Sequence, residues 1–317
     1  MKKATALSVI GVLALAGSAM AQVDGSYQGA YGGPIVYQNV GTGFGDSNMG
    51  LINSANGSEI DAAFAYATGG NLNLLVTGNL EGGGTTYNKM VFFFDNGNAG
   101  GYNVLPGGMQ QFPGNYAGMT LDQAGVNGAT QTFRATHWLS VTCGGSGAGF
   151  GMFVDGGSLL ANDGQYLGGN DGQSAGVLTG GNNVLNAAVA LNNSNTLGVN
   201  GAAGTAQGPN ALSAFTGVEI QIPLASLGLG SLVGLKAMAF INGQNHDYLC
   251  NQFLGSTPVG VGNLGNDGAG TYTNGNLNLI NLNGTYAAGD QWFLVPAPSS
   301  MALLGLGGLL AARRRRA

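Results

Sequence analysis

The chain has 317 residues, long enough for one large all-β domain, and its 61 glycines and 8 prolines leave it below the ~25–30% Gly plus Pro at which disorder becomes the default. Six of the nine basic residues lie at the two ends and all fourteen acidic residues lie between them, so the interior carries a formal charge of about −11. This charge excludes a basic surface for nucleic acid and disfavours binding to anionic membranes.

The N-terminus has the pattern of an export signal. Two lysines precede an apolar stretch over 4–17, and Ala19 and Ala21 frame the small-x-small pattern that signal peptidase reads. We expect residues 1–21 to be removed as a signal peptide, which leaves Gln22 as the new N-terminus. The alternative is a membrane anchor, but about fourteen apolar residues are short for a ~20-residue span.

We expect residues 22–294 to form one Gly/Asn-rich, all-β domain, an antiparallel β-sandwich of jelly-roll-like type, because short strands alternate with tight turns. The apolar run Val91–Phe94 predicts a strand buried on both faces. Alternating apolar residues predict strands with one buried face at Ile60, Ala62 and Phe64, at Leu72, Leu74 and Val76, and at Val218, Ile220 and Ile222.

Weaker patterns fill the rest of this domain. The Gly/Asn-rich stretch over 156–209 has few apolar pairs and is expected to form long loops over one edge. Asn-Gly and Asp-Gly pairs suit the positive φ angles of turns. Further strands are expected at Trp138–Thr142, Phe150–Val154, Leu235–Ile241 and Leu277–Leu282, and a short helical turn at Pro223–Leu229.

Four segments of this domain stand out by their order along the chain: Asp24-Gly25, Gly69–Val76, Val91–Asp95 and Gly217–Leu224. This order resembles the strand order of family-nine carbohydrate-binding and DOMON-like sandwiches. The resemblance implies a sandwich fold more than a ligand. The paired tryptophans with which the family clamps a sugar are not identifiable, since the chain has only Trp138 and Trp292.

One pair of carboxylates suggests an enzyme. Glu59 and Asp61 are two residues apart on a predicted strand, as in the Glu-x-Asp-x-Glu row of laminarinase-type glycosidases. The third carboxylate is absent, because Ala63 stands in its place. We therefore interpret the pair as surface carboxylates, and we expect no catalytic residues.

The two histidines and two cysteines raise two further possibilities. The spacing of His137, Cys143, His246 and Cys250 resembles no compact metal-binding pattern, so we expect neither a metal nor a cofactor. An exported chain reaches an oxidising compartment, where an even cysteine count is usually paired. We therefore expect a disulfide between Cys143 and Cys250, with two buried thiols as the alternative.

Several tyrosines lie in Gly/Asn-rich segments. We interpret them as rim residues of the surface, with stacking on sugars as the alternative. They are Tyr27, Tyr31, Tyr37, Tyr102 and Tyr116.

Residues 295–317 form a tripartite tail. A Pro-rich strip precedes an apolar run over 301–312, which at ~1.5 Å per residue reaches about 18 Å and is short for a ~30 Å hydrocarbon core. Terminal arginines stall export with their charge on the cytoplasmic side. The strip is Val295-Pro296-Ala297-Pro298, and the basic cluster is Arg313, Arg314, Arg315 and Arg316.

This tail resembles the PEP-CTERM sorting signal that exosortase-type enzymes recognise, with Ala297 where the family usually has Glu. The resemblance implies processing by an exosortase-like enzyme; a simple C-terminal membrane anchor is the alternative. We thus expect a non-enzymatic protein of the cell surface or extracellular matrix, transiently anchored in the inner membrane by its tail. Its expected partners are signal peptidase and the sorting enzyme, with extracellular polysaccharide as a candidate. A carbohydrate-binding module with a defined sugar pocket is the second hypothesis.

Overall fold

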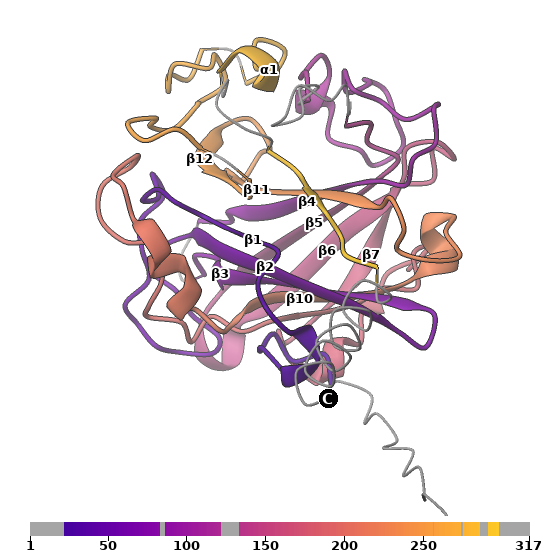
Figure 1. Cartoon of the computed structure of the whole chain (residues 1–317), viewed down its shortest axis with the longest axis horizontal. Helices are drawn as coiled ribbons and strands as arrows, with labels where there is room; N and C mark the ends of the chain where they lie inside the picture. Colours follow the sequence, from indigo (N-terminus) through magenta and orange to yellow (C-terminus); the bar gives the residue numbers. More distant parts are fainter. Residues whose placement is uncertain are drawn as a thin grey trace, which may run out of the picture.

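The computed structural model describes residues 22–82, 86–121, 133–255, 257–273, 275–285 and 291–297. Within these ranges the chain forms two antiparallel sheets that pack face to face in a sandwich-like arrangement (Figure 1). The expected signal peptide over 1–21 and the tail from Pro298 onward lie outside the described residues. No helix in the described part of the chain is long and apolar enough to cross a membrane.

The smaller sheet has the strand order β1-β2-β3-β10-β9. Gly69 and Gly70 join β2 to β3 in a two-residue turn, and both have positive φ, the conformation that such turns require. Its strands are β1 (Val36–Tyr37), β2 (Glu59–Thr68), β3 (Asn71–Asn79), β9 (Ala188–Leu191) and β10 (Gly217–Pro223).

The larger sheet has the order β12-β11-β4-β5-β6-β7-β8, and β13 also pairs with β11. Its strands are β4 (Lys89–Asp95), β5 (His137–Gly144), β6 (Gly151–Ser158), β7 (Gln165–Asn170), β8 (Thr179–Gly180), β11 (Lys236–Asn242), β12 (Leu249–Phe253) and β13 (Phe293–Leu294). The remaining elements are the 3-10 turns η1 (Gly29–Tyr31), η2 (Gly114–Tyr116), η3 (Gly147–Gly149), η4 (Ser174–Gly176), η5 (Gly208–Ser213) and η6 (Leu224–Leu227), and the helix α1 (Leu282–Thr285).

The core between the sheets confirms most of the predicted alternation. Leu72, Leu74 and Val76 of β3 all enter it, as do the three predicted residues of β10. The prediction for 91–94 is also confirmed: Phe92 and Phe94 face the core between the sheets, whereas Val91 and Phe93 face a second core on the other side of β4.

That second core lies between the larger sheet and irregular segments that gather on its far side (Figure 1). Leu105, Phe112 and Tyr116 come from the connection between β4 and β5, and Leu277 and Ile280 come from the chain after β12. The predicted strand over 277–282 is wrong, because this segment is irregular up to α1 and buries its apolar side chains without joining a sheet.

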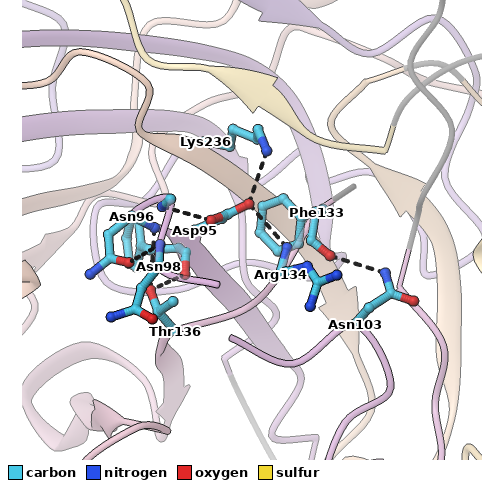
Figure 2. Close-up of polar contacts among 10 residues, drawn as sticks. Asp95, Asn96, Asn98, Asn103, Phe133, Arg134, Thr136 and Lys236 are labelled. Carbon is cyan, nitrogen blue, oxygen red and sulfur yellow. Dashed lines mark hydrogen bonds and ion pairs between the residues drawn. The ribbon is translucent and has the colours of Figure 1, made fainter. Parts of the chain in front are cut away.

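Asp95 ties the end of β4 to its surroundings (Figure 2). Its carboxylate accepts hydrogen bonds from Gly97 N at 2.8 Å and from Arg134 N at 3.0 Å, and it forms an ion pair with Lys236 Nζ at 3.0 Å. Lys236 also lies 5.3 Å from the ring centroid of Trp292, just before β13. These contacts hold the last described strand against β11 and β4.

The stretch over 156–209 departs from the expected long loops. It contains the end of β6 and all of β7, β8 and β9, so it supplies strands to both sheets. Leu167 and Val189 of these strands enter the core between the sheets. This stretch has few apolar residues of its own, but its strands pair with neighbouring strands whose side chains bury them.

Candidate functional site

A β-bulge near the start of β2 shapes the candidate site. Ile60 pairs with Gly78 and Ala63 with Val76, so Asp61 and Ala62 together oppose the single residue Thr77. The Thr77 hydroxyl accepts a hydrogen bond from Ala62 N at 3.0 Å and donates one to Ala62 O at 3.2 Å. The side chain thus satisfies backbone groups that the bulge removes from the ladder.

The bulge changes which residues share a face. Ile60 and Ala63 enter the core between the sheets, whereas Ala62 and Phe64 pack on the outer face of the smaller sheet. The predicted alternation of Ile60, Ala62 and Phe64 is therefore wrong at Ile60. By the two-residue period, Glu59 lies on the face opposite to Ile60, the outer face.

Glu59 and Asp61 are buried, which corrects their interpretation as surface carboxylates. Their exposed fractions are 1% and 0%. Burial is the main cause that raises the pKa of Glu59 to about 10, and the neighbouring carboxylates Asp61 and Asp46 raise it further. Burial also raises the pKa of Asp61 well above its usual value. Glu59 therefore holds its proton at neutral pH.

Asn195 joins the two carboxyl groups. Its side-chain amide lies 3.3 Å from Glu59 Oε1 and 3.3 Å from Asp61 Oδ2. Asp61 Oδ1 accepts a further hydrogen bond from Val199 N at 2.7 Å. Gly198 has a φ of +124°, and a Cβ atom there would lie 2.1 Å from Asp61 Oδ1, so this close approach requires glycine.

Amide side chains hold the 195–200 loop over β2. Asn79, at the end of β3, donates to the carbonyl groups of Asn193 at 2.7 Å and of Asn195 at 3.3 Å. The Asn193 side chain exchanges two hydrogen bonds with the backbone of Leu80. The loop that covers the carboxylates is thus fixed to β3.

A cavity of about 240 Å³ opens beside Glu59. Asp46 supplies a second carboxyl group, whose Oδ2 accepts a hydrogen bond from Gly201 N at 2.8 Å and whose pKa burial raises. Among the described residues, Glu59 Oε2 and Asp46 Oδ1 are buried and make no hydrogen bond of normal geometry. The Ser47 N–H lies close enough to the Glu59 carboxyl group to lower its pKa slightly, against the larger effect of burial. The lining residues are Asp46, Ser47, Glu59, Thr196, Leu197, Gly198, Val199, Asn200, Asn210 and Ser213.

This cavity, which we call the Glu59 pocket, can bind a small polar ligand. Two carboxyl oxygens lack partners, and the hydroxyl and amide side chains around them both donate and accept hydrogen bonds. Leu197, 61% exposed, adds an apolar surface at the same cavity. Asp61 does not line the cavity, and its hydrogen bonds to Val199 and Asn195 give it a positioning role.

The structure does not bring the histidines and cysteines together. His137 and Cys143 lie toward opposite ends of β5, about 20 Å apart at ~3.4 Å per residue. His246 bonds to the Tyr116 hydroxyl at 2.8 Å, and burial lowers its pKa to about 3. Across the described ranges, no group of three or more His, Cys, Asp or Glu side chains is arranged to hold a metal ion.

The expected disulfide is contradicted, because Cys143 and Cys250 are both buried free thiols. Strand register explains why. Thr142 pairs with Lys89, Lys89 with Asn242, and Asn242 with Leu249, so the two cysteines follow residues that lie three strand spacings apart. At ~4.8 Å per spacing this is about 14 Å, twice the ~7 Å that a disulfide spans between Cα atoms.

Tyr31 and Tyr116 are buried, contrary to the expectation of rim residues; their exposed fractions are 2% and 0%. The Tyr31 hydroxyl donates to Glu219 Oε1 at 2.6 Å, and Glu219 Oε2 accepts from the backbone N–H groups of Asp24 and Gly25. Glu219 of β10 therefore fixes the N-terminal segment of the described chain.

The described part of the predicted sorting motif begins inside the fold. Val295 is 3% exposed, packs in the core between the sheets, and its N–H donates to Leu235 O at 2.9 Å. Pro296 is exposed, and Ala297 is half-buried. At the other end, Gln22 is described and exposed, whereas Ala19, Ala21, Pro298 and Arg313–Arg316 lie outside the described residues.

Sequence reasoning singled out Glu59 and Asp61 and missed the other groups at the site. Asp46, Asn195 and Gly198 lie in Gly/Asn-rich segments with no distinguishing pattern. The surplus of Asn over 192–200 was the available signal, because buried amides need partners and so predict loops that pack. No protein-family model matches the chain, and neither the curated proteins nor the solved structures contain a significant match to it.

Proposed function

We propose that this chain is an exported, non-enzymatic protein of the cell surface or extracellular matrix, and that it binds glycan through the Glu59 pocket. The observation that carries the proposal is the carboxyl group of Glu59: the residue lines the cavity, and its buried Oε2 has no hydrogen-bond partner among the described residues. An unpaired buried polar atom costs free energy, which a ligand can recover.

The residues that line the Glu59 pocket favour a sugar ring as the ligand. Each sugar hydroxyl donates and accepts, which matches a pocket of carboxyl, amide and hydroxyl groups. The volume of about 240 Å³ lies below the ~300–1,000 Å³ of pockets for drug-sized ligands, so the ligand has the size of one ring. Leu197 offers an apolar contact for the C–H face of such a ring.

We propose binding rather than hydrolysis because the second carboxyl group of the sequence pair is already engaged. Glycoside hydrolysis needs two carboxyl groups that both face the scissile bond. Asp61 is fully buried, accepts a hydrogen bond from the Val199 N–H, and does not line the pocket. Asp46 does line it, but its Oδ2 is already engaged by Gly201 N at 2.8 Å, so we assign Asp46 to ligand binding.

Delivery to the surface belongs to the same proposal. We propose a single β-sandwich domain of jelly-roll type between a signal peptide over 1–21 and a PEP-CTERM-like tail, with signal peptidase and an exosortase-like enzyme as processing partners. The sequence patterns of both ends support this proposal. The exposure of Pro296, where the chain leaves the larger sheet after β13, also supports it, because a sorting enzyme needs an accessible strip.

A glycan array probed with the purified full-length chain tests the proposal. We expect the array to show selective hits. We expect titration calorimetry with a glycan that binds to show that Glu59→Gln weakens binding at least about tenfold, which is the contribution of one charged or buried hydrogen bond. Glu81→Gln, the same change outside the pocket, should bind like the wild type. An array without hits refutes glycan binding, and reducing sugar released from a bound glycan refutes the non-enzymatic assignment.

A further inference from the structure

We infer that the Glu59 pocket selects amino sugars, whose ring carries a protonated amine, over neutral and N-acetylated sugars. The inference rests on the proposed glycan binding and names the class of sugar. It starts from the ionisable groups of the pocket: two carboxyl side chains line it, and no Lys, Arg or His side chain is among its described lining residues.

The basic side chains of the described chain are engaged elsewhere. Lys236 pairs with Asp95, and the charge of Lys89 acts on Asp155. Arg134 is exposed and donates to Ala99 O. Among the described residues, no basic side chain is therefore placed to pair with an ionised Glu59 or Asp46, and a cationic ligand would supply that charge.

The two unpartnered oxygens specify what that ligand carries. Glu59 Oε2 and Asp46 Oδ1 belong to residues that line one cavity, and neither oxygen makes a hydrogen bond of normal geometry within the described chain. An ammonium group has three N–H donors and no acceptor, so it can serve more than one oxygen at once. An N-acetylated amine is bulkier than an ammonium group, has only one N–H donor and carries no positive charge.

Charge explains the selectivity. Asp46 and Asp61 raise the pKa of Glu59 by repulsion, in addition to the effect of burial. A cation bound beside Glu59 favours the ionised carboxylate, so binding releases the proton that Glu59 holds in the free protein. A neutral sugar brings no such attraction and gains only ordinary hydrogen bonds.

Hydroxyl and amide side chains complete the pocket around the ring. Ser47, Asn200, Asn210 and Ser213 can each bond to ring hydroxyls, which a bare cation does not have. This part of the lining favours an amino sugar over a simple metal or ammonium ion.

Titration calorimetry of the full-length chain tests the inference, with glucosamine, N-acetylglucosamine, glucose, ammonium and Ca²⁺ as probes at pH 6. We expect glucosamine to bind about tenfold or more tightly than either other sugar, the discrimination of one charge-assisted contact. Repeating the titration in buffers of different ionisation heat should show proton release. Glu59→Gln and Asp46→Asn should each remove the preference, whereas Glu81→Gln should keep it, with thermal unfolding confirming that each variant is folded.

The remaining outcomes differ in whether they overturn the amino-sugar inference alone or also the proposed glycan binding. Equal binding of all three sugars overturns the amino-sugar inference and leaves the proposed function intact. Binding of ammonium or Ca²⁺ as tight as that of glucosamine shows a simple cation site and also overturns it. If no sugar binds, both the inference and the proposed function fail.

Discussion

Glu59 shows at the scale of one residue how burial decides the charge of a carboxyl group. Its pKa is raised to about 10, whereas the same group in the unfolded chain has its ordinary value near 4.5. Between these values the folded protein keeps a proton that the unfolded chain releases. Rising pH therefore favours unfolding through this window.

We predict that Glu59→Gln makes the stability of the protein less dependent on pH. The glutamine has no proton to release, so the variant loses a slope of up to about 1.4 kcal/mol per pH unit. Urea unfolding between pH 5.5 and 8 measures the free energy at each pH. An unchanged slope in Glu59→Gln would show that Glu59 is ionised in the folded protein; Glu81→Gln is the control.

The two thiols give a second prediction for single residues. Burial raises the pKa of Cys143 to about 12 and raises that of Cys250, so both should be unreactive in the folded protein at pH 8. Titration with a thiol reagent, without reductant, should find two thiols per chain after denaturation. If denaturation releases none, the cysteines are oxidised, and the register that separates them is wrong.

At the scale of elements, the bulge in β2 positions the site, and Thr77 holds the bulge. Thr77→Val keeps the shape of the side chain but leaves the N–H and C=O of Ala62 without their partner, which should cost about 1–3 kcal/mol. Thr77→Ser keeps the hydroxyl and should lose far less. Equal losses in the two variants would mean that packing, rather than the hydroxyl, stabilises the bulge; urea unfolding distinguishes them.

At this bulge, the apolar periodicity of the sequence no longer predicts which side chains face the core. In β3 and β10 the alternation predicts the buried face correctly, and in β4 the continuous apolar run predicts burial on both faces. In β2 one extra residue reverses the assignment of Ile60 relative to Ala62, and nothing in the local sequence indicates it. A bulge depends on the partner strand, here on Thr77, so periodicity within one strand does not reveal it.

The candidate site escapes prediction for a related reason. Glu59 and Asn195 are 136 residues apart in sequence, and the loop around Asn195 is positioned by Asn79 on another strand. Whether a carboxylate is buried depends on which loop covers it. That arrangement belongs to the tertiary structure and leaves no short motif.

At the scale of the whole molecule, the C-terminal strand separates the fold from its tail. Trp292, Phe293 and Val295 are buried, and burial of each contributes about 1.5–3 kcal/mol. We predict that a chain ending at Ala297 unfolds at the temperature of the full-length protein, whereas one ending at Gln291 is strongly destabilised. Equal thermal midpoints for both would contradict the integration of β13 into the sheet.

The same truncation tests the sorting proposal in cells. A chain that ends at Ala297 keeps its fold but lacks the apolar run and the arginines, so it should leave the envelope and enter the medium. Fractionation measures this. Retention of the folded, truncated protein in the membrane would show that the tail is not its anchor.

The central claim is that a ligand binds beside Glu59, and mapping by NMR tests it most directly. An isotope-labelled full-length chain titrated with glucosamine should show amide shift changes centred on 46–47, 59, 196–200, 210 and 213, the residues that line the pocket. These changes should disappear in Glu59→Gln. Shifts centred elsewhere, such as the cavity beside Tyr31 and Tyr66, or no shifts at millimolar ligand, would contradict the claim.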